Sequence, residues 1–452
     1  MISPPTFPGG SEPRRHVMPI LVVVVYVLLW GFEGAARKWV PGLESILYVA
    51  RDAFIAVALI VTLLGSSRTR RQPAVVWAFI GIVILMSSLS IIMGSPVAVG
   101  IIGARSYLAP VLLVVFVLSC ERSDIFFLPT LRTICVIALV NVPVTVVQVL
   151  SSPAAVINKQ VGDGTAYFVN PGDIVRASGT FSSPLGHTQL QPLALAAAIV
   201  ALHSRSVSRW LSVPTLFGVA LMTLLSGSRG AVISDLVVVV VYLLALVTMA
   251  TFRSLLTAFT AIGTLVLLVV VTVTVFPAVI QSFLTRIDQA SRAEDVSGRV
   301  LGNTFDFLTT PLSMLGSGAG SASTAAQNLG VGVAVENDMP RWVTELGVLG
   351  FALCVLRLAA GVYFVAAILR GPRRGSLAIM MFSAVLAPVA LTGVITLTPS
   401  SQGAFAIALS LYMIAIRDRA DHSPPSAQFG SVDATGMSLV GATASRDLRN
   451  DG

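Results

Sequence analysis

A glycine- and serine-rich segment around Arg229 has the residue types needed to hold an anion. It reads Ser226-Gly227-Ser228-Arg229-Gly230-Ala231 and directly precedes a long apolar run. Backbone N–H groups at the start of a helix, combined with an arginine side chain, bind phosphate oxygens. The segment is therefore a candidate anion site, although a simple structural turn would have the same spacing.

A second arginine, Arg176, opens a run of small and hydroxylated residues. The run continues through Ala177-Ser178-Gly179-Thr180 to Pro184, and His187 follows it. Small residues let a ligand approach the backbone, and hydroxyls donate hydrogen bonds, which suits a phosphate or a sugar. An ordinary turn-rich loop with an exposed arginine is the alternative, and these residues alone favour it.

Two carboxylates, Glu336 and Asp338, follow a glycine-rich stretch that begins at Gly316. A carboxylate at the lip of a membrane span fits a general base, and a glycine run can cradle phosphate. Solvated loop carboxylates beside a flexible linker would produce the same pattern.

The sequence has no motif of a nucleotide-driven or metal-dependent enzyme. It contains no Walker A segment, no strand-borne GxGxxG, no Gly-x-Ser-x-Gly and no Asp-x-Asp pair. Cys120, Cys135 and Cys354 lie in or beside apolar runs without metal-ligand spacing. We therefore expect neither a metal nor a cofactor.

The elements that position these residues are apolar enough to require a bilayer. The chain has 452 residues, of which 55% are hydrophobic and 11% charged, and its mean hydropathy is +0.88. An all-α polytopic integral membrane protein follows, because one soluble core cannot bury that much apolar surface. We expect about twelve transmembrane helices, near residues 17–32, 45–65, 74–93, 104–119, 126–150, 188–203, 210–226, 230–250, 255–276, 342–369, 376–396 and 402–416.

Arginine and lysine residues give the expected orientation. The net charge is +8, but the basic residues are scattered between apolar runs rather than gathered on one face, so nucleic acid is not an expected partner. The clusters fall in alternate connections, which places both termini in the cytoplasm. Arg14 and Arg15 precede a first span without a cleavage site, so that span is expected to remain.

Residues 1–416 are expected to form a single membrane domain with two long outer-face loops, about 151–187 and 277–341. Connections of this length exceed what neighbouring helices need, so function is expected there. The second loop contains an amphipathic stretch, Phe283 to Phe307, that suits a membrane surface. Residues 417–452 have the composition of a disordered cytoplasmic tail.

Several charges lie at the outer ends of the expected spans, where each needs a partner. Glu33, Arg37 and Lys38 follow the first span, and Arg105 begins the fourth. For the charges deeper in the spans, namely Arg51, Asp52 and Asp235, structural pairing is the favoured interpretation.

Four stretches together resemble the O-antigen ligase and polysaccharide polymerase family of membrane glycosyltransferases. They are Glu33 to Trp39 with Arg51-Asp52, then Arg176 to Pro184, Ser226 to Ala231, and Gly316 to Gly350. They occur in the family's order and extend over residues 30–415.

The resemblance implies an enzyme of the bacterial inner membrane that uses a polyprenyl-pyrophosphate-linked glycan without a metal. Outer-face arginines would hold the pyrophosphate, and Arg37, Arg176, Arg229 and Arg299 occupy matching places. Membrane lipid and other polysaccharide assembly proteins would be further partners. The reaction would be an inverting transfer to a sugar hydroxyl, in which pyrophosphate leaves and cations stabilise its charge.

One departure bears on the acceptor. Ligases of this family commonly have His-Asn where this chain has Glu336-Asn337. The base would then be Glu336, Asp338 or His187, and a polymerase is favoured over a ligase that transfers glycan to lipid A core. A lipid or polysaccharide transporter is the next interpretation, since twelve spans are ordinary there too. A non-catalytic envelope scaffold is the third.

Overall fold

The computed structural model describes residues 13–65, 74–161, 169–170, 174–204, 207–249, 296–371 and 376–422, with isolated positions between 263 and 285. The first helices are α1 (Pro13–Trp39), α2 (Glu44–Gly65), α3 (Ala74–Ile92), α4 (Val97–Ser119) and α5 (Phe127–Leu150). Strands β1 (Val169–Asn170) and β2 (Ile174–Val175) precede α6 (Pro184–Ser204), α7 (Arg209–Leu225) and α8 (Arg229–Met249). The last helices are α11 (Val296–Phe305), α12 (Thr324–Asn328), α13 (Asp338–Leu346), α14 (Val348–Leu369), α15 (Leu377–Thr392) and α16 (Pro399–His422).

Nine of the described helices are long and apolar enough to cross a bilayer, judged by length and composition. They are α1 to α6, α8, α14 and α16, and the chain is therefore an α-helical membrane protein. The apolar helices α7 and α15 are shorter, with 17 and 16 residues. These elements overlap eleven of the twelve expected spans, and the remaining one, 255–276, lies almost entirely outside the described residues.

The expected span 342–369 is wrong at its start, because Gly347 divides it into α13 and α14. Gly347 has φ +59°, and a Cβ there would lie 2.4 Å from the Ser313 carbonyl oxygen. Gly350 allows the two helices to pack tightly, since its Cβ would lie 1.8 Å from the Trp342 carbonyl oxygen. The charged residues Asp338, Arg341 and Glu345 consequently lie buried in the separate helix α13 instead of extending α14.

The connections and the last helix also differ in detail from expectation. The loop expected at 151–187 ends earlier, because α6 already begins at Pro184. Its β1 and β2 pair antiparallel, with Val169 opposite Val175. In the amphipathic stretch 283–307, α11 covers the described end. Helix α16 continues past residue 416 to His422, and residues 423–452 of the expected tail lie outside the described part.

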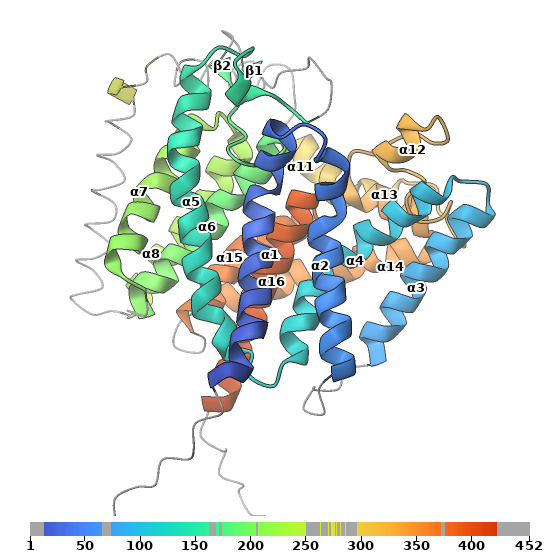
Figure 1. The fold of residues 1–452 in the computed structure, drawn as a ribbon, viewed down its shortest axis with the longest axis horizontal. Helices are drawn as coiled ribbons and strands as arrows, with labels where there is room; N and C mark the ends of the chain where they lie inside the picture. The colour runs from blue at the N-terminus through green and yellow to red at the C-terminus, as the bar shows by residue number, and fades with distance from the viewer. Residues whose placement is uncertain are drawn as a thin grey trace, which may run out of the picture.

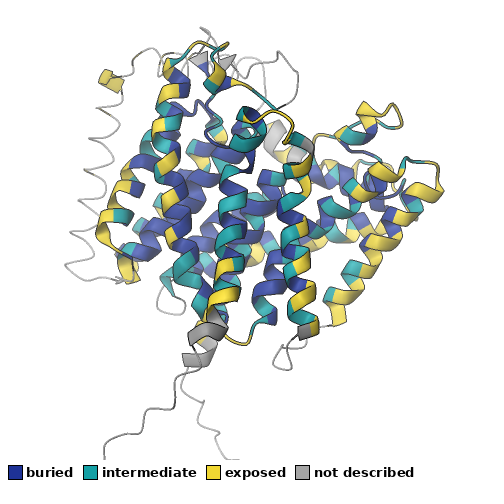
Figure 2. Ribbon diagram, viewed as in Figure 1, coloured by how far each residue is buried: buried dark blue, intermediate teal, exposed yellow. Residues whose placement is uncertain are grey.

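Helices α6 and α15 form the centre of the bundle. Figure 2 shows them mostly buried, whereas α3 is exposed along much of its outer side. Alanines 194 and 196–198 of α6 are all buried, and such small residues allow close approach of neighbouring helices. The exposed apolar side chains of α2, α3 and α8 are those expected to contact lipid tails.

The start of α1 and the end of α16 lie at one end of the bundle, opposite β1 and β2 (Figure 1). We call the end that carries β1 and β2 the loop end. Near it, the beginning of α16 is tied to the first two helices. Trp30 donates its indole N–H to the Ser400 carbonyl at 2.8 Å, and Arg51 Nη1 donates to the Pro399 carbonyl at 2.7 Å.

Candidate functional site

The turn between α15 and α16, residues 393–398, is sunk into the bundle, and we call it the recessed turn. Helix α15 has 16 residues, which gives a length of about 24 Å at 1.5 Å per residue, less than the roughly 30 Å of a hydrocarbon core. Ile395 and Thr396 of the turn are buried. The turn therefore places non-helical backbone at a depth where every polar group needs a protein partner.

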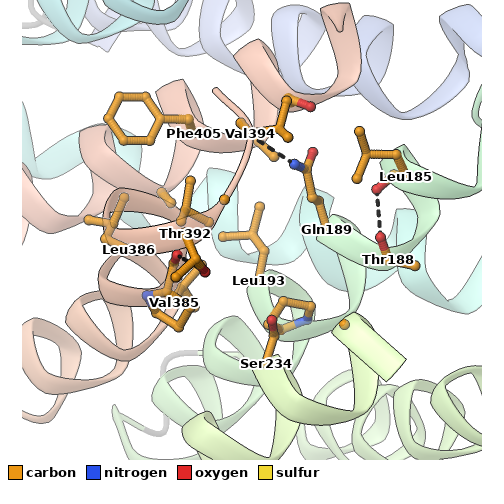
Figure 3. Close-up of a pocket in the computed structure, with 18 residues that line it drawn as sticks. Leu185, Thr188, Gln189, Leu193, Ser234, Val385, Leu386, Thr392, Val394 and Phe405 are labelled. Atoms are coloured by element: carbon orange, nitrogen blue, oxygen red, sulfur yellow. Dashed lines mark hydrogen bonds between the residues drawn. The ribbon is translucent and has the colours of Figure 1, made fainter. Parts of the chain in front are cut away.

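A cavity of about 250 Å³ lies between α6, α8, α15 and α16, beside the recessed turn. Most of its lining is apolar, and the polar side chains that line it are Thr188, Gln189, Ser234, Thr392 and Ser401. Figure 3 shows Gln189 reaching toward Val394, whose carbonyl accepts from Gln189 Nε2 at 3.4 Å. Among the described residues, the buried Oε1 of Gln189 has no hydrogen-bond partner.

Asp338 and Arg357 hold the recessed turn from the side of α13 and α14. Asp338 accepts hydrogen bonds from the backbone N–H of Ile395, from the backbone N–H of Thr396 at 3.0 Å and from the Thr396 hydroxyl at 2.6 Å. Arg357 donates to the carbonyls of residues 389, 390 and 393 at the end of α15. A cation at a helix C-terminus complements the free carbonyls and the helix dipole.

A second buried carboxylate, Glu345, fastens α13 to the rest of the molecule. It accepts from Arg341 Nε at 2.8 Å, from the Tyr107 hydroxyl at 2.8 Å and from the backbone N–H of Ala322 at 3.1 Å. Burial alone would lower the pKa of Arg341, but Glu345, Tyr107 and Asp338 together outweigh it and leave this pKa raised. Helix α13 is thus anchored near both of its ends, by Asp338 and by Glu345.

The segment that follows Arg176 is held by α1 and α5. Lys38 Nζ donates to Ser178 Oγ at 3.0 Å and to the Gly179 carbonyl at 2.6 Å. From α5, Gln148 Oε1 accepts from the backbone N–H groups of the same two residues at 3.1 and 2.8 Å. Gly179 has φ +56°, and a Cβ there would lie 2.1 Å from Asn141 Oδ1. The segment is a fixed structure rather than a loose loop.

The Arg176 segment lies beside the turn that leads into α8. Ala177 packs in one cluster with Val149 of α5 and Leu225 at the end of α7. Arg229 is the first residue of α8 and is half-buried, and its neighbour Gly230 lines the cavity. The structure therefore brings the two predicted anion-binding segments together at the loop end, next to the cavity.

The turn before α8 uses part of the backbone that was expected to hold an anion. The Ser228 N–H donates to Ser226 Oγ at 3.2 Å, and Ser228 Oγ accepts from the Ala231 N–H at 3.4 Å. Gly227 has φ +59°, which a residue with a side chain rarely adopts. The arginine side chain, more than these amides, remains the group of the segment best suited to a ligand.

The three candidate bases lie in different surroundings. His187 is fully buried, with Thr145 Oγ1 3.0 Å from Nε2 and Gln191 Nε2 3.2 Å from Nδ1. Asp338 is enclosed by the recessed turn. Glu336 is exposed and, among the described residues, makes no hydrogen bond or ion pair. Glu336 is thus the one of the three that an acceptor reaches without rearrangement.

The remaining predicted residues are placed as follows. Arg37 forms an ion pair with Glu33 at 3.2 Å on the preceding turn of α1. The side chain of Arg299 lies outside the described part of the structure, although its backbone belongs to α11. Arg51 and Asp52 pair at 2.7 Å, as their interpretation as structural charges predicted. Asp235 accepts a hydrogen bond from the Thr223 hydroxyl of α7.

Sequence reasoning did not identify Arg357 or Gln189 as part of this region. Arg357 could have been found, because it is a single charge inside the apolar run Leu353 to Gly361 and such a charge needs a partner. Gln189 has no comparable signal, since one amide near a helix start is common. Within the described residues there is no group of three His, Cys, Asp or Glu side chains placed to hold a metal.

Comparison of the sequence with protein-family models and with curated proteins finds no match. The fold itself defines the class of the protein, which is an α-helical membrane protein.

Proposed function

We propose that the protein is a polysaccharide polymerase-type glycosyltransferase that takes a glycan from a polyprenyl-pyrophosphate donor. The observation that carries this proposal is the junction of the Arg176 segment with the Arg229 turn beside the cavity lined by Gly230. Two arginines can bind pyrophosphate oxygens bidentately, and the mostly apolar cavity suits hydrocarbon. An amphipathic substrate with a diphosphate head and a hydrocarbon tail would match both the two arginines and the apolar cavity.

The proposal includes a topology. Twelve spans, with the loop end facing outward from a bacterial inner membrane and both termini in the cytoplasm, agree with the positions of the arginines in the short connections. A lipid-linked donor would then keep its tail between the helices while its glycan extends outward. Arg37 lies on the same end of α1 as Lys38, which holds the Arg176 segment.

The reaction would be an inverting transfer with Glu336 as the general base. The acceptor hydroxyl oxygen forms a bond to the anomeric carbon, the bond from that carbon to the pyrophosphate oxygen breaks, and the hydroxyl proton moves to Glu336. The pyrophosphate leaves with the electron pair, and Arg176 and Arg229 stabilise its charge. Glu336 is preferred over Asp338 and His187 because both of these already have their hydrogen-bonding atoms occupied.

Turnover by purified protein in nanodiscs tests the proposal, with a polyprenyl-pyrophosphate oligosaccharide as the sole substrate and EDTA present. Wild type is compared with Arg229→Lys and Glu336→Gln, and products are sized by mass spectrometry. Arg122→Lys and Glu121→Gln, exposed and at the opposite end of the bundle, are the matched controls. Longer lipid-linked glycans made by wild type and both controls, but reduced at least a hundredfold in the two test variants, would support the proposal.

Absence of any glycan transfer by the wild-type protein would overturn the proposed glycosyltransferase function. Adding a lipid A core acceptor in a parallel reaction distinguishes a ligase, which would extend that acceptor and leave the donor unpolymerised.

A transporter is the second candidate, and one observation favours it. Asp338 and Arg357 pair inside the bundle at non-helical backbone, an arrangement that transporters use at their substrate sites. The test uses liposomes that contain the protein and a fluorescent polyprenyl-linked sugar. Movement of this lipid between leaflets, without transfer of its glycan, would favour a transporter over the glycosyltransferase.

A further inference from the structure

Five buried charges form a network between the loop-end halves of α1, α2 and α4. Arg51 pairs with Asp52 at 2.7 Å and lies 3.8 Å from Glu33, and Arg105 Nε donates to the second oxygen of Asp52 at 2.7 Å. Arg37 pairs with Glu33 at 3.2 Å. The five side chains are between 1% and 11% exposed, so the network is almost entirely removed from solvent.

The network carries an excess of positive charge. Three guanidinium groups face two carboxylates, which leaves a net charge of at least +1, since protonation of either carboxylate only increases it. Among the described residues, no carboxylate other than Glu33 and Asp52 forms an ion pair with these three arginines, and Glu44 accepts from the Gly42 N–H. A cation in a membrane interior is costly without an anion beside it.

The excess charge is concentrated around Tyr48 of α2. The guanidinium of Arg105 lies 4.0 Å from the Tyr48 ring centroid and that of Arg37 lies 5.0 Å from it. Arg105 Nη2 donates to the Tyr48 carbonyl at 2.7 Å. Among the described residues, Arg105 Nη1 and Arg37 Nε have no hydrogen-bond partner. Donors therefore remain for an anionic oxygen.

A groove of about 310 Å³ between α2 and α4 begins at this charged cluster. Its lining includes the two network residues Asp52 and Arg105 together with apolar side chains such as Val49, Ala53, Ile101 and Leu112. Val49 and Ile101 are 45% and 60% exposed. Both helices are candidate membrane spans, so the groove opens toward lipid.

We propose that this groove binds an anionic phospholipid of the surrounding bilayer, with one acyl chain between α2 and α4 and its phosphate at Arg105 and Arg37. The apolar lining matches a hydrocarbon chain, and the excess positive charge matches an anionic head. A bilayer phospholipid is chosen over a polyisoprenyl lipid because the groove is open to the membrane along α2 and α4. This site is separate from the cavity between α6, α8, α15 and α16, and the inference does not rest on the proposed function.

Photo-crosslinking tests the proposal on the full-length protein in detergent after lipid removal. The probe is phosphatidylglycerol with a photoreactive acyl chain, and phosphatidylcholine with the same chain is the reference. Mass spectrometry maps the labelled peptides. We expect labelling of α2 and α4 peptides at a concentration at least tenfold lower for phosphatidylglycerol than for phosphatidylcholine.

Two variants test the acyl-chain contacts and the head-group contacts of the lipid separately. Ala53→Phe fills the groove from its exposed side, and we expect it to reduce labelling by phosphatidylglycerol at least tenfold. Arg105→Gln removes one positive charge and the main head-group donor while Asp52 stays paired with Arg51. We therefore expect the ratio of labelling by phosphatidylglycerol to labelling by phosphatidylcholine to fall to about one. Ala359→Phe, at an exposed position of α14, is the matched control and should label as wild type does. Thermal unfolding of each variant verifies its fold.

Labelling outside α2 and α4, equal labelling by both lipids, or unchanged labelling of Ala53→Phe would each overturn the proposal. A competing arm with unlabelled undecaprenyl phosphate tests the choice of occupant. Displacement of the probe by this lipid at concentrations below those of phosphatidylglycerol would assign the groove to a polyisoprenyl lipid and overturn the proposal. The same arm with glycerol phosphate alone should cause no displacement, because the chain contacts are missing.

Discussion

Asp338 Oδ2 and Arg357 Nη1 lie 3.4 Å apart within the bundle, and each residue also binds the backbone of the recessed turn, Asp338 at Thr396 and Arg357 at Gly393. Their side chains are 1% and 4% exposed. The pair therefore joins three helices, α13, α14 and α15, at a position where water is not available to replace either partner. Its main effect is to fix the shape of one wall of the cavity.

Asp338→Asn should lower the free energy of unfolding by about 3 kcal/mol, because Arg357 would remain buried without its counter-charge. Thermal unfolding of the full chain in detergent measures this as a lower midpoint. Asp306→Asn, at an exposed position, should stay within about 0.5 kcal/mol of wild type. A fully stable Asp338→Asn protein without activity would instead indicate that Asp338 acts as the base.

Gly34→Ala should disrupt the contact between α1 and the segment that precedes α6. A Cβ at Gly34 would lie 2.2 Å from the Ser182 backbone nitrogen and 2.4 Å from the Phe181 carbonyl carbon. Backbone must then move, which we expect to cost about 3 kcal/mol. Gly81→Ala has no atom within 4 Å of the new Cβ and should be neutral or slightly stabilising. Equal unfolding midpoints for the two variants would contradict the close packing described.

Lys38→Met should loosen the Arg176 segment, because it removes both hydrogen bonds from α1 to Ser178 and Gly179. Each such bond contributes about 1 kcal/mol net. We expect amide hydrogen exchange in peptides covering residues 174–183 to become at least tenfold faster, measured by mass spectrometry in nanodiscs. Lys159→Met changes an exposed lysine of the same connection and is the control. No change in exchange would mean that α5 alone holds the segment.

Cys120, at the end of α4, should react slowly with iodoacetamide up to unusually high pH. Burial raises the pKa of its thiol to about 11, against an opposing effect of Arg417. Since the thiolate is the reactive form, the alkylation rate should reach half its maximum near pH 11 in a Cys135→Ala, Cys354→Ala background.

The same shift predicts how stability depends on pH. The native state keeps the Cys120 proton longer than the unfolded chain, so this group's contribution is complete below about pH 8.5 and is lost as the pH rises to about 11. Arg417→Gln should move the alkylation midpoint higher still. A midpoint near pH 8.5 would show that the thiol is solvated.

Much of the helical framework could be predicted because it depends on local composition. Apolar runs of sufficient length located the nine described helices that can cross a bilayer. The cost of isolated charge in a membrane predicted that Arg51 and Asp52 would be paired. The break at Gly347 was not predictable in this way. Residues 342–369 are mostly apolar, with Glu345 and Arg357 as the charged exceptions. The left-handed glycine follows from contacts with Ser313 and Gly316 of a distant loop.

The candidate site was predictable only in part, for a related reason. Arg176 and Arg229 were singled out by their small neighbours, yet the meeting of their two segments depends on the packing of Ala177 against Leu225. Asp338 was identified as a carboxylate near a membrane lip. Its hydrogen bonds to Ile395 and Thr396, 57 and 58 residues later in the chain, could not be read from residue types.

The ties of the first two helices to the start of α16 have a consequence for how the protein is made. Trp30 and Arg51 find their partners 370 and 348 residues later. At roughly 5 to 20 residues per second, a ribosome needs on the order of 20 to 70 s to supply them. During that interval the Arg51 guanidinium and the Trp30 indole N–H lack their final acceptors in α16. Assembly of α1 with α2 is therefore completed only when the last helix, α16, inserts.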